Sequence, residues 1–140
     1  FLRPVSPPAD VVRFDLPLPA TSTSVQASLA LAPNGRSIVV QTTWTTGDRL
    51  LRLRRLDKTE LEPLPGTDGA ALPTWSWDSS TIAFRAEGKL RRFDVATSSV
   101  RDLVSVSDSA VTGLAYGPDG TLAVSSVNAP LQLLKPGAGT

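Results

Sequence analysis

The side chains available for chemistry in this sequence are carboxylates, hydroxyls, arginines and lysines, because the chain contains no His, no Cys and no Met. Without His or Cys, a Ser-His-Asp triad, a thiolate nucleophile and a His/Cys zinc site are excluded. A hydroxyl nucleophile would then need a Lys or carboxylate base, and Lys58, Lys89 and Lys135 do not stand in Ser-x-x-Lys spacing. The sequence therefore predicts no catalytic residue, no metal site and no cofactor, and favours a protein that is not an enzyme.

Three turn residues are candidates for acid, base or metal chemistry: Asn34, Asp78 and Asp119. They stand at the same place in similar Pro-Asn-Gly, Trp-Asp-Ser and Pro-Asp-Gly sequences, so an Asx turn explains all three at once. Gly35 and Gly120 follow two of them and tolerate the positive φ that such turns require. No Asp-x-Asp-x-Asp-Gly calcium loop is present. We expect all five residues to be structural.

A group of arginines is the second candidate, because a basic stripe on a strand can bind phosphates or acidic peptides. Acidic residues lie close by in the sequence, which favours a solvated strand face with surface ion pairs instead. The group consists of Arg49, Arg52, Arg54 and Arg55, with a similar pair at Arg91 and Arg92.

Tryptophan is the third candidate. Trp44 lies in a Thr-rich hairpin where no burial pattern demands an aromatic, so it either contacts a partner or packs within the fold. Trp75 is expected in the core and Trp77 as a substitute for the proline of its turn. Our candidate contacts for a protein or peptide partner are therefore Trp44, Arg52 and Arg54.

Size and charge bound the remaining classes of function. The chain has 140 residues and a formal net charge of +1, which suits one domain and carries no electrostatic footprint for nucleic acid. Its longest apolar stretches are far shorter than the about 20 residues that span a bilayer, so we expect no membrane insertion. The composition does not identify a compartment.

Short apolar runs separated by turn residues predict an all-β architecture, since no segment carries a sustained helical stripe. The expected strands are Val11–Leu16, Ser28–Ala32, Ser37–Thr42, Leu50–Leu56, Thr59–Leu64, Leu72–Trp75, Thr81–Arg85, Lys89–Asp94, Ser99–Val104, Thr112–Tyr116, Thr121–Ser125 and Pro130–Leu134.

An internal repeat organises these strands. Three segments share the pattern of strand, Asx turn and strand: Leu29–Val40, Pro73–Phe84 and Leu114–Val124. Their turn residues are 44 and 41 positions apart, and a second landmark that ends at Asp57, Asp94 and Lys135 recurs after 37 and 41. About 40–45 residues with four short strands is the period of a β-propeller blade, whose first strand is expected to be innermost.

The repeat divides the chain into an N-terminal strand (residues 1–20), blade 1 (21–67), blade 2 (68–107) and blade 3 without its outer strand (108–140). Three blades cannot close a ring, since propellers have about four to eight. We expect a homodimer that forms a six-bladed ring, in which the N-terminal strand of each copy completes the third blade of the other. The alternatives are an excerpt of a larger propeller and an engineered half-propeller.

The repeated Pro-Asp/Asn-Gly turns, the Leu-x-Arg-Leu/Phe-Asp strands and the Trp75–Ser79 segment resemble TolB-like (WD-repeat-like) β-propellers, over roughly residues 11–136. Propellers behind bacterial serine/threonine protein kinase domains are similar to this chain at three places: Val12–Pro19, Glu62–Gly69, and Trp75–Ser79 followed by Ile82–Phe84. The resemblance implies a scaffold for protein interaction or a sensor, extracytoplasmic if the kinase link holds. The other reading that it leaves open is the propeller part of a larger enzyme, such as a peptidase or hydrolase.

Overall fold

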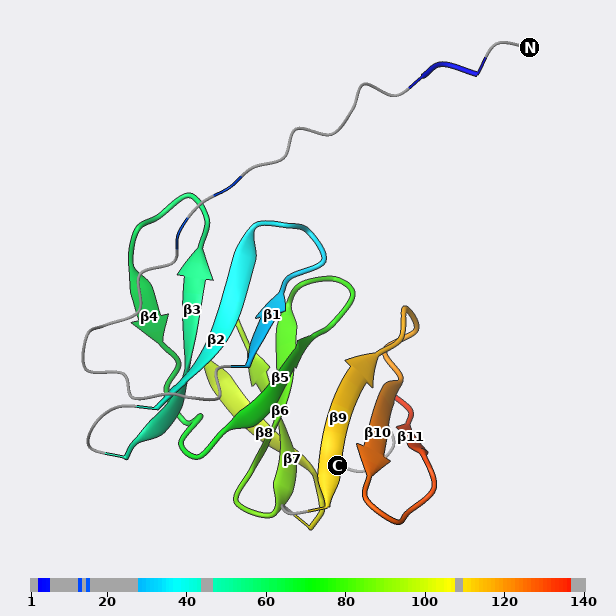
Figure 1. The fold of residues 1–140 in the computed structure, drawn as a ribbon. Helices are drawn as coiled ribbons and strands as arrows, with labels where there is room; N and C mark the ends of the chain where they lie inside the picture. Colours follow the sequence, from blue (N-terminus) through cyan, green and yellow to red (C-terminus); the bar gives the residue numbers. More distant parts are fainter. Residues whose placement is uncertain are drawn as a thin grey trace.

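The computed structural model describes residues 3–5, 13, 15, 28–43, 47–107 and 110–136 of the chain. Within these ranges the chain forms eleven strands and no helix (Figure 1). The strands are β1 (Leu29–Leu31), β2 (Ser37–Thr43), β3 (Arg49–Arg55), β4 (Leu61–Pro63), β5 (Ala71–Trp75), β6 (Thr81–Ala86), β7 (Lys89–Asp94), β8 (Ser99–Ser105), β9 (Val111–Tyr116), β10 (Leu122–Ser126) and β11 (Gln132–Leu134).

The strands form three separate antiparallel sheets, each a meander in chain order. Strands β1 to β4 form blade 1, β5 to β8 form blade 2, and β9 to β11 form blade 3, which has three strands in the part of the chain that the structure describes. Each described strand therefore pairs with its neighbour in the sequence. This arrangement needs only short connections, of the kind that the turn residues of the repeat supply.

Hairpin length differs between the blades. Strands β6 and β7 are joined by Glu87 and Gly88, whose φ angles of 51° and 73° suit a two-residue turn that matches the twist of the strands. In blade 1 the corresponding connection is longer, because β2 ends at Thr43 and β3 begins only at Arg49. The longer hairpin accounts for most of the irregular spacing between the first two repeats.

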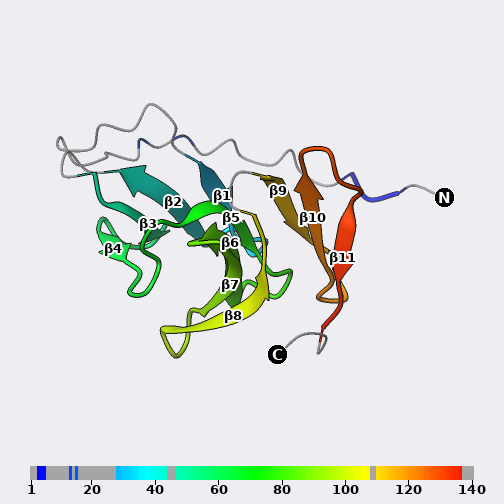
Figure 2. The ribbon, with the colours of Figure 1, turned by 90° about the horizontal axis from the view of Figure 1, so that it is seen from below.

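The three sheets fan outward from their first strands. Strand β1 lies beside β5, and β5 lies beside β9, whereas β4, β8 and β11 point away from this centre (Figure 2). The innermost position expected for the strand before each Asx turn is thus observed. The expectation of an all-β chain is confirmed in the described ranges.

The first hydrophobic core lies between blades 1 and 2. Each Leu, Ile or Phe that is fully buried there contributes about 1.5–3 kcal/mol to folding. Its buried residues are Ala32, Val39, Leu51, Leu53, Leu64, Ala70, Trp75, Ile82, Phe84, Ala86 and Phe93. The second core lies between blades 2 and 3, with the buried residues Ala83, Leu90, Val111, Leu122 and Val124.

Blade 2 contributes alternate residues to the two cores, because successive side chains of a strand point to opposite faces. Ile82 and Phe84 of β6 belong to the first core, and Ala83 between them belongs to the second. We call the face toward the preceding blade the rear face and the face toward the following blade the forward face. Both faces of blade 2 are therefore covered, as stacked propeller blades require.

Strand prediction succeeded from residue 28 onward. Every expected strand from Ser28–Ala32 onward has an observed counterpart. The expected N-terminal strand, Val11–Leu16, lies outside the described residues except for Arg13 and Asp15, which are not in a strand.

The expected alignment of the third strands needs one correction. The repeat equated Asp57 with Asp94, but the register pairs Arg55 with Ser37 and Asp94 with Thr81, the equivalent positions after the turn. Arg55 is therefore the counterpart of Asp94, and the alignment was two residues off. A shift of two keeps every side chain on its own face, so the apolar pattern alone could not distinguish the two alignments.

Candidate functional site

Asp78 holds its turn together through one carboxylate oxygen. Its Oδ1 accepts hydrogen bonds from the hydroxyls of Ser76 and Ser80, both at 2.6 Å, and from the backbone N–H of Ser80 at 3.0 Å. These bonds, that of Ser76 first, favour the charged form and lower the pKa of Asp78 to about 2. A carboxyl group with so low a pKa is a poor general acid or base near neutral pH.

Asn34 and Asp119 repeat this geometry. The Oδ1 atom of Asn34 accepts from the backbone N–H of Arg36 at 2.9 Å, and that of Asp119 accepts from the N–H of Thr121 at 3.0 Å. This backbone bond is the main reason why the pKa of Asp119 is also lowered. The bond from residue i+2 to residue i is that of an Asx turn, which supports the structural role expected for these residues.

The residue after each Asx position adopts a left-handed conformation. The φ angles are 70° at Gly35, 60° at Ser79 and 83° at Gly120. The serine of blade 2 has a contact that glycine cannot make, since its Oγ accepts a hydrogen bond from the N–H of Asn34 at 3.1 Å. The turns of blades 1 and 2 are thus joined directly.

The two tryptophans of β5 and its turn have different roles. Trp75 is 6% exposed, and its Nε1 donates to the carbonyl of Ala30 on β1 at 2.9 Å. Trp77 occupies the proline position of the turn, is 58% exposed, and donates from Nε1 to the carbonyl of Tyr116 on β9 at 2.8 Å. Each indole therefore links blade 2 to a neighbouring blade.

Two of the three candidate partner contacts, Arg52 and Arg54, lie in the described part of the chain and share one face of β3. Arg52 is buried, its Nη1 donates to Thr42 Oγ1, and burial lowers its pKa. Arg54 is half-buried, and its Nη1 donates to the carbonyl of Thr59 at 2.7 Å. Trp44 lies outside the described residues. In this chain Arg52 is therefore placed for packing rather than for surface contact.

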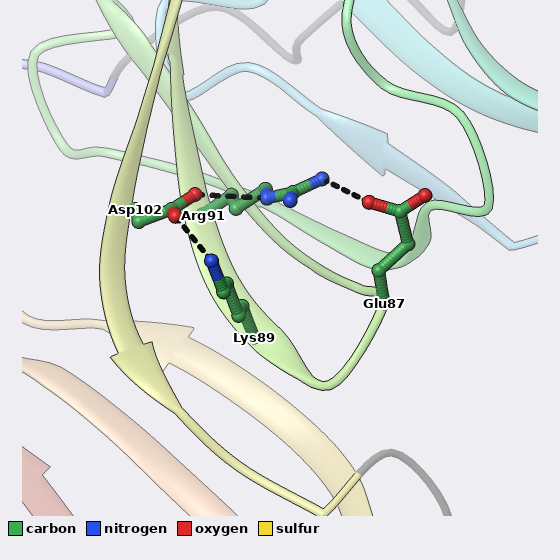
Figure 3. A network of polar contacts seen from close by, with 4 residues as sticks. All are labelled: Glu87, Lys89, Arg91 and Asp102. Carbon is green, nitrogen blue, oxygen red and sulfur yellow. Dashed lines mark hydrogen bonds and ion pairs between the residues drawn. The ribbon is translucent and has the colours of Figure 1, made fainter.

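The second arginine pair splits across the two faces of blade 2. Arg91 lies on the rear face, where its Nε bonds Asp102 Oδ1 at 2.9 Å and its Nη1 bonds Glu87 Oε2 at 3.0 Å (Figure 3). Lys89 reaches the other oxygen of Asp102 at 2.8 Å. These hydrogen bonds, with Lys89 first, lower the pKa of Asp102. Here the predicted solvated face with surface ion pairs is observed.

The rear face of blade 1 presents exposed leucines at positions that are covered in the other blades. Trp75 and Tyr116 stand three residues before their Asx residues and pack into the first and second cores. Leu31 stands at the same distance before Asn34, yet it is 56% exposed, and Leu29 is 63% exposed. No blade among the described residues covers this face.

The forward face of blade 3 is open as well. Ala123 of β10 pairs with Ala115 on one side and Leu133 on the other, and all three side chains share this face. The equivalents of Ala123 in the other blades, Val39 and Ala83, are fully buried, whereas Leu133 is 59% exposed and Leu131 65%. Both ends of the described fan therefore expose leucines, although Val40, Thr42 and Arg52 on the rear face of blade 1 are buried.

Two classes of site find no support in the described ranges. No group of three His, Cys, Asp or Glu side chains there is arranged to hold a metal ion. The same ranges contain no helix with the length and hydropathy of a membrane span.

The chain matches no protein-family model and no curated protein sequence. Solved structures do match it. TolB from Acinetobacter baumannii superimposes with a TM-score of 0.67 at 21% identity, over 82% of this chain and 31% of that one. The β-propeller domain of the Trilobed protease from Pyrococcus furiosus, described as having an open velcro topology, matches with a TM-score of 0.62 at 15% identity, over 76% and 37%.

A chain of the Mitotic Checkpoint Complex matches with a TM-score of 0.58 at 16% identity, over 94% of this chain and 44% of that one. At such identities the likeness concerns the fold alone. The chain has a TolB-like β-propeller fold, which confirms the fold predicted from the repeat. It spans less than half the length of each of these three structures.

Proposed function

We propose that this chain is a non-catalytic β-propeller module for protein binding and scaffolding, and that two copies join into one six-bladed ring. The observation that carries the proposal is the exposure of Leu31, 56% against 6% for its counterpart Trp75. A monomer would leave Leu29 and Leu31 in water, although the faces that meet between neighbouring blades of the described fan bury their apolar side chains.

The two open faces suit each other. The rear face of blade 1 presents Leu29 and Leu31, and the forward face of blade 3 presents small residues beside Leu131 and Leu133. Within the chain, large rear-face residues such as Trp75 and Phe84 pack against the preceding blade in the same way. A head-to-tail contact that closes after two copies gives a ring with twofold symmetry.

Light scattering after size-exclusion chromatography tests this assembly. We expect a particle of twice the 14.8 kDa chain mass, and we expect Leu31→Asp to convert it to a monomer or to an aggregating species. Val127→Asp is the matched control, because Val127 is 52% exposed in the turn after β10 and should leave the dimer intact. A wild-type chain that stays a stable 14.8 kDa monomer would contradict the proposal.

The hydrogen bonds of the turn residues support a scaffold role rather than a catalytic one. The carboxylates that the repeat brings to equivalent positions bond their own backbones, and the pKa of Asp78 is too low for proton transfer near pH 7. By resemblance, we also propose that the module serves as a sensor attached to a bacterial kinase, which the coding sequence upstream of residue 1 would test.

The alternative function is the propeller part of a larger enzyme. The similarity to the propeller domain of the Trilobed protease favours it at the level of fold. A peptidase domain encoded in the same reading frame would support this alternative, and the scaffold proposal would then concern the propeller alone.

A further inference from the structure

A small cleft with both charged and apolar lining residues lies between blades 2 and 3, away from the two open faces. It has a volume of about 270 Å³, and its walls include the turn of blade 2, strands β7 and β8, and the end of β11. Its charged lining residues are Arg92, Arg101, Lys135 and Asp78. Because both walls belong to one chain, the cleft does not depend on a second copy.

Two arginines oppose each other in this cleft. Arg92 of β7 is the direct register partner of Arg101 on β8, so the two side chains share the forward face of blade 2. Among the described residues, neither forms an ion pair within 4 Å or a side-chain hydrogen bond. Like charges directly opposite on paired strands are destabilising unless an anion neutralises them.

The rear face of the same two strands shows how such charge is normally balanced. There Arg91 is opposite Asp102, and Lys89 and Glu87 complete an alternating network (Figure 3). One pair of strands thus carries compensated charge on one face and uncompensated arginines on the other. The contrast points to a negative group that is supplied from outside the described chain.

The acidic groups nearby do not supply it. Asp78 lines the cleft, but three hydrogen bonds from Ser76 and Ser80 already engage its Oδ1. Asp119 is held first by the backbone N–H of Thr121, and Lys135 also helps to lower the pKa of Asp119. The lining holds three cations and one carboxylate, and the region keeps a net positive charge even when Asp119 beside Lys135 is counted.

We propose that this cleft binds an oxyanion, either a carboxylate of an acidic peptide or a phosphate group, through Arg92 and Arg101. The planar guanidinium group donates two parallel hydrogen bonds to such oxygens, which a lysine cannot do. The cleft is smaller than the ~300–1,000 Å³ typical of sites for drug-sized molecules, so it suits one projecting anionic group.

The test titrates two probes separately into the ¹⁵N-labelled chain at constant ionic strength: inorganic phosphate, and a capped Glu-Glu dipeptide. We expect saturable shift changes at residues around Arg92 and Arg101 with at least one probe, and the preferred probe identifies the source of the anion. Arg101→Gln should weaken binding about ten- to a hundred-fold, the effect of losing a charged hydrogen bond. Lys58→Gln removes an exposed positive charge from a turn in blade 1 and should leave the affinity unchanged.

The stability of the same variants separates a binding role from a structural one. In low salt without either probe, Arg101→Gln should keep or raise the melting temperature, because it removes the cross-strand repulsion. A fall in melting temperature would mean that Arg101 stabilises the fold, and would overturn the proposal. Linear, non-saturating shifts with both probes, or equal weakening by Lys58→Gln, would overturn it as well.

Discussion

At the scale of single residues, the polar side chains of the repeat satisfy backbone groups. Asp78, Asn34 and Asp119 each accept a hydrogen bond from the backbone N–H two residues later. A turn that exposes its N–H groups between two strands needs such an acceptor, and a carboxylate makes a stronger one than an amide. The blade 2 turn adds two serine hydroxyls and is the most extensively bonded of the three.

Asp78 gives a prediction about pH. Its pKa in the folded chain is about 2, below the ordinary value of 3.8, so its contribution to stability is complete above pH ~4 and is lost as the pH falls toward 2. We expect Asp78→Asn to lower the melting temperature at pH 7 only slightly, because Asn34 closes the equivalent turn. The difference between the two proteins should shrink between pH 4 and pH 2.

Thermal melts of both proteins at pH 7, 4, 3 and 2 provide the measurement. Asp78→Ala removes the acceptor altogether and should cost about 1 kcal/mol in the free energy of unfolding at pH 7. A difference between wild type and Asp78→Asn that stays constant down to pH 2 would show that the charge of Asp78 does not stabilise the turn.

At the scale of elements, short turns let the strands of each blade pair with their neighbours, and two glycines show what these turns require. Gly35 and Gly66 have φ angles of 70° and 77°, which L-residues rarely adopt. Their surroundings differ, however. A Cβ at Gly35 would meet nothing within 4 Å, whereas one at Gly66 would lie 2.9 Å from Cγ2 of Val100, which packs against the first core.

Alanine at these two positions should therefore cost different amounts. Gly35→Ala adds only backbone strain, which should lower the free energy of unfolding by about 1 kcal/mol. Gly66→Ala adds the same strain and must also displace Val100. We therefore expect it to lower the free energy of unfolding by about 2 kcal/mol or more. Urea unfolding of the two variants measures both values, and equal costs would mean that the contact with Val100 relaxes freely.

At the scale of the whole molecule, the described fan of blades ends in two faces that expose leucines. Stacked blades resemble other repeat proteins, in which each repeat is stabilised mainly by its neighbours. Blade 2 has a neighbour on each face, whereas blades 1 and 3 have one each among the described residues. The blades at the two ends are therefore expected to be the least stable part of a monomer.

If two copies close the ring, stability must depend on protein concentration, because the dimer is favoured by mass action. We expect the melting temperature of the wild-type chain to rise as the concentration is increased a hundred-fold. Leu31→Asp should melt at a lower temperature that does not change with concentration. Scanning calorimetry or fluorescence melts give the comparison, and a wild-type melting temperature independent of concentration would argue for a monomer.

The candidate site could be predicted only in part. The Asx turns were found from sequence because each is a contact between residues two apart. The arginines were recognised as a group, but Arg101 was not among them. It stands nine residues after Arg92 in the chain, and only the register of β7 with β8 makes the two direct neighbours. Opposite basic residues on paired strands are a signal that a search of the expected hairpin could have used.

Residues close together in the sequence determine the strands of this chain. Turn residues end the strands, and the alternation of side chains with a period of two gives every strand two faces. These patterns were enough to predict the blades and their repeat. They do not specify what each face meets, because residues two apart share a face whatever the register. The burial of Arg52, the opposition of Arg92 to Arg101 and the exposure of Leu31 follow from how sheets pair and stack. Contacts between residues that are distant in the sequence exist only after that packing.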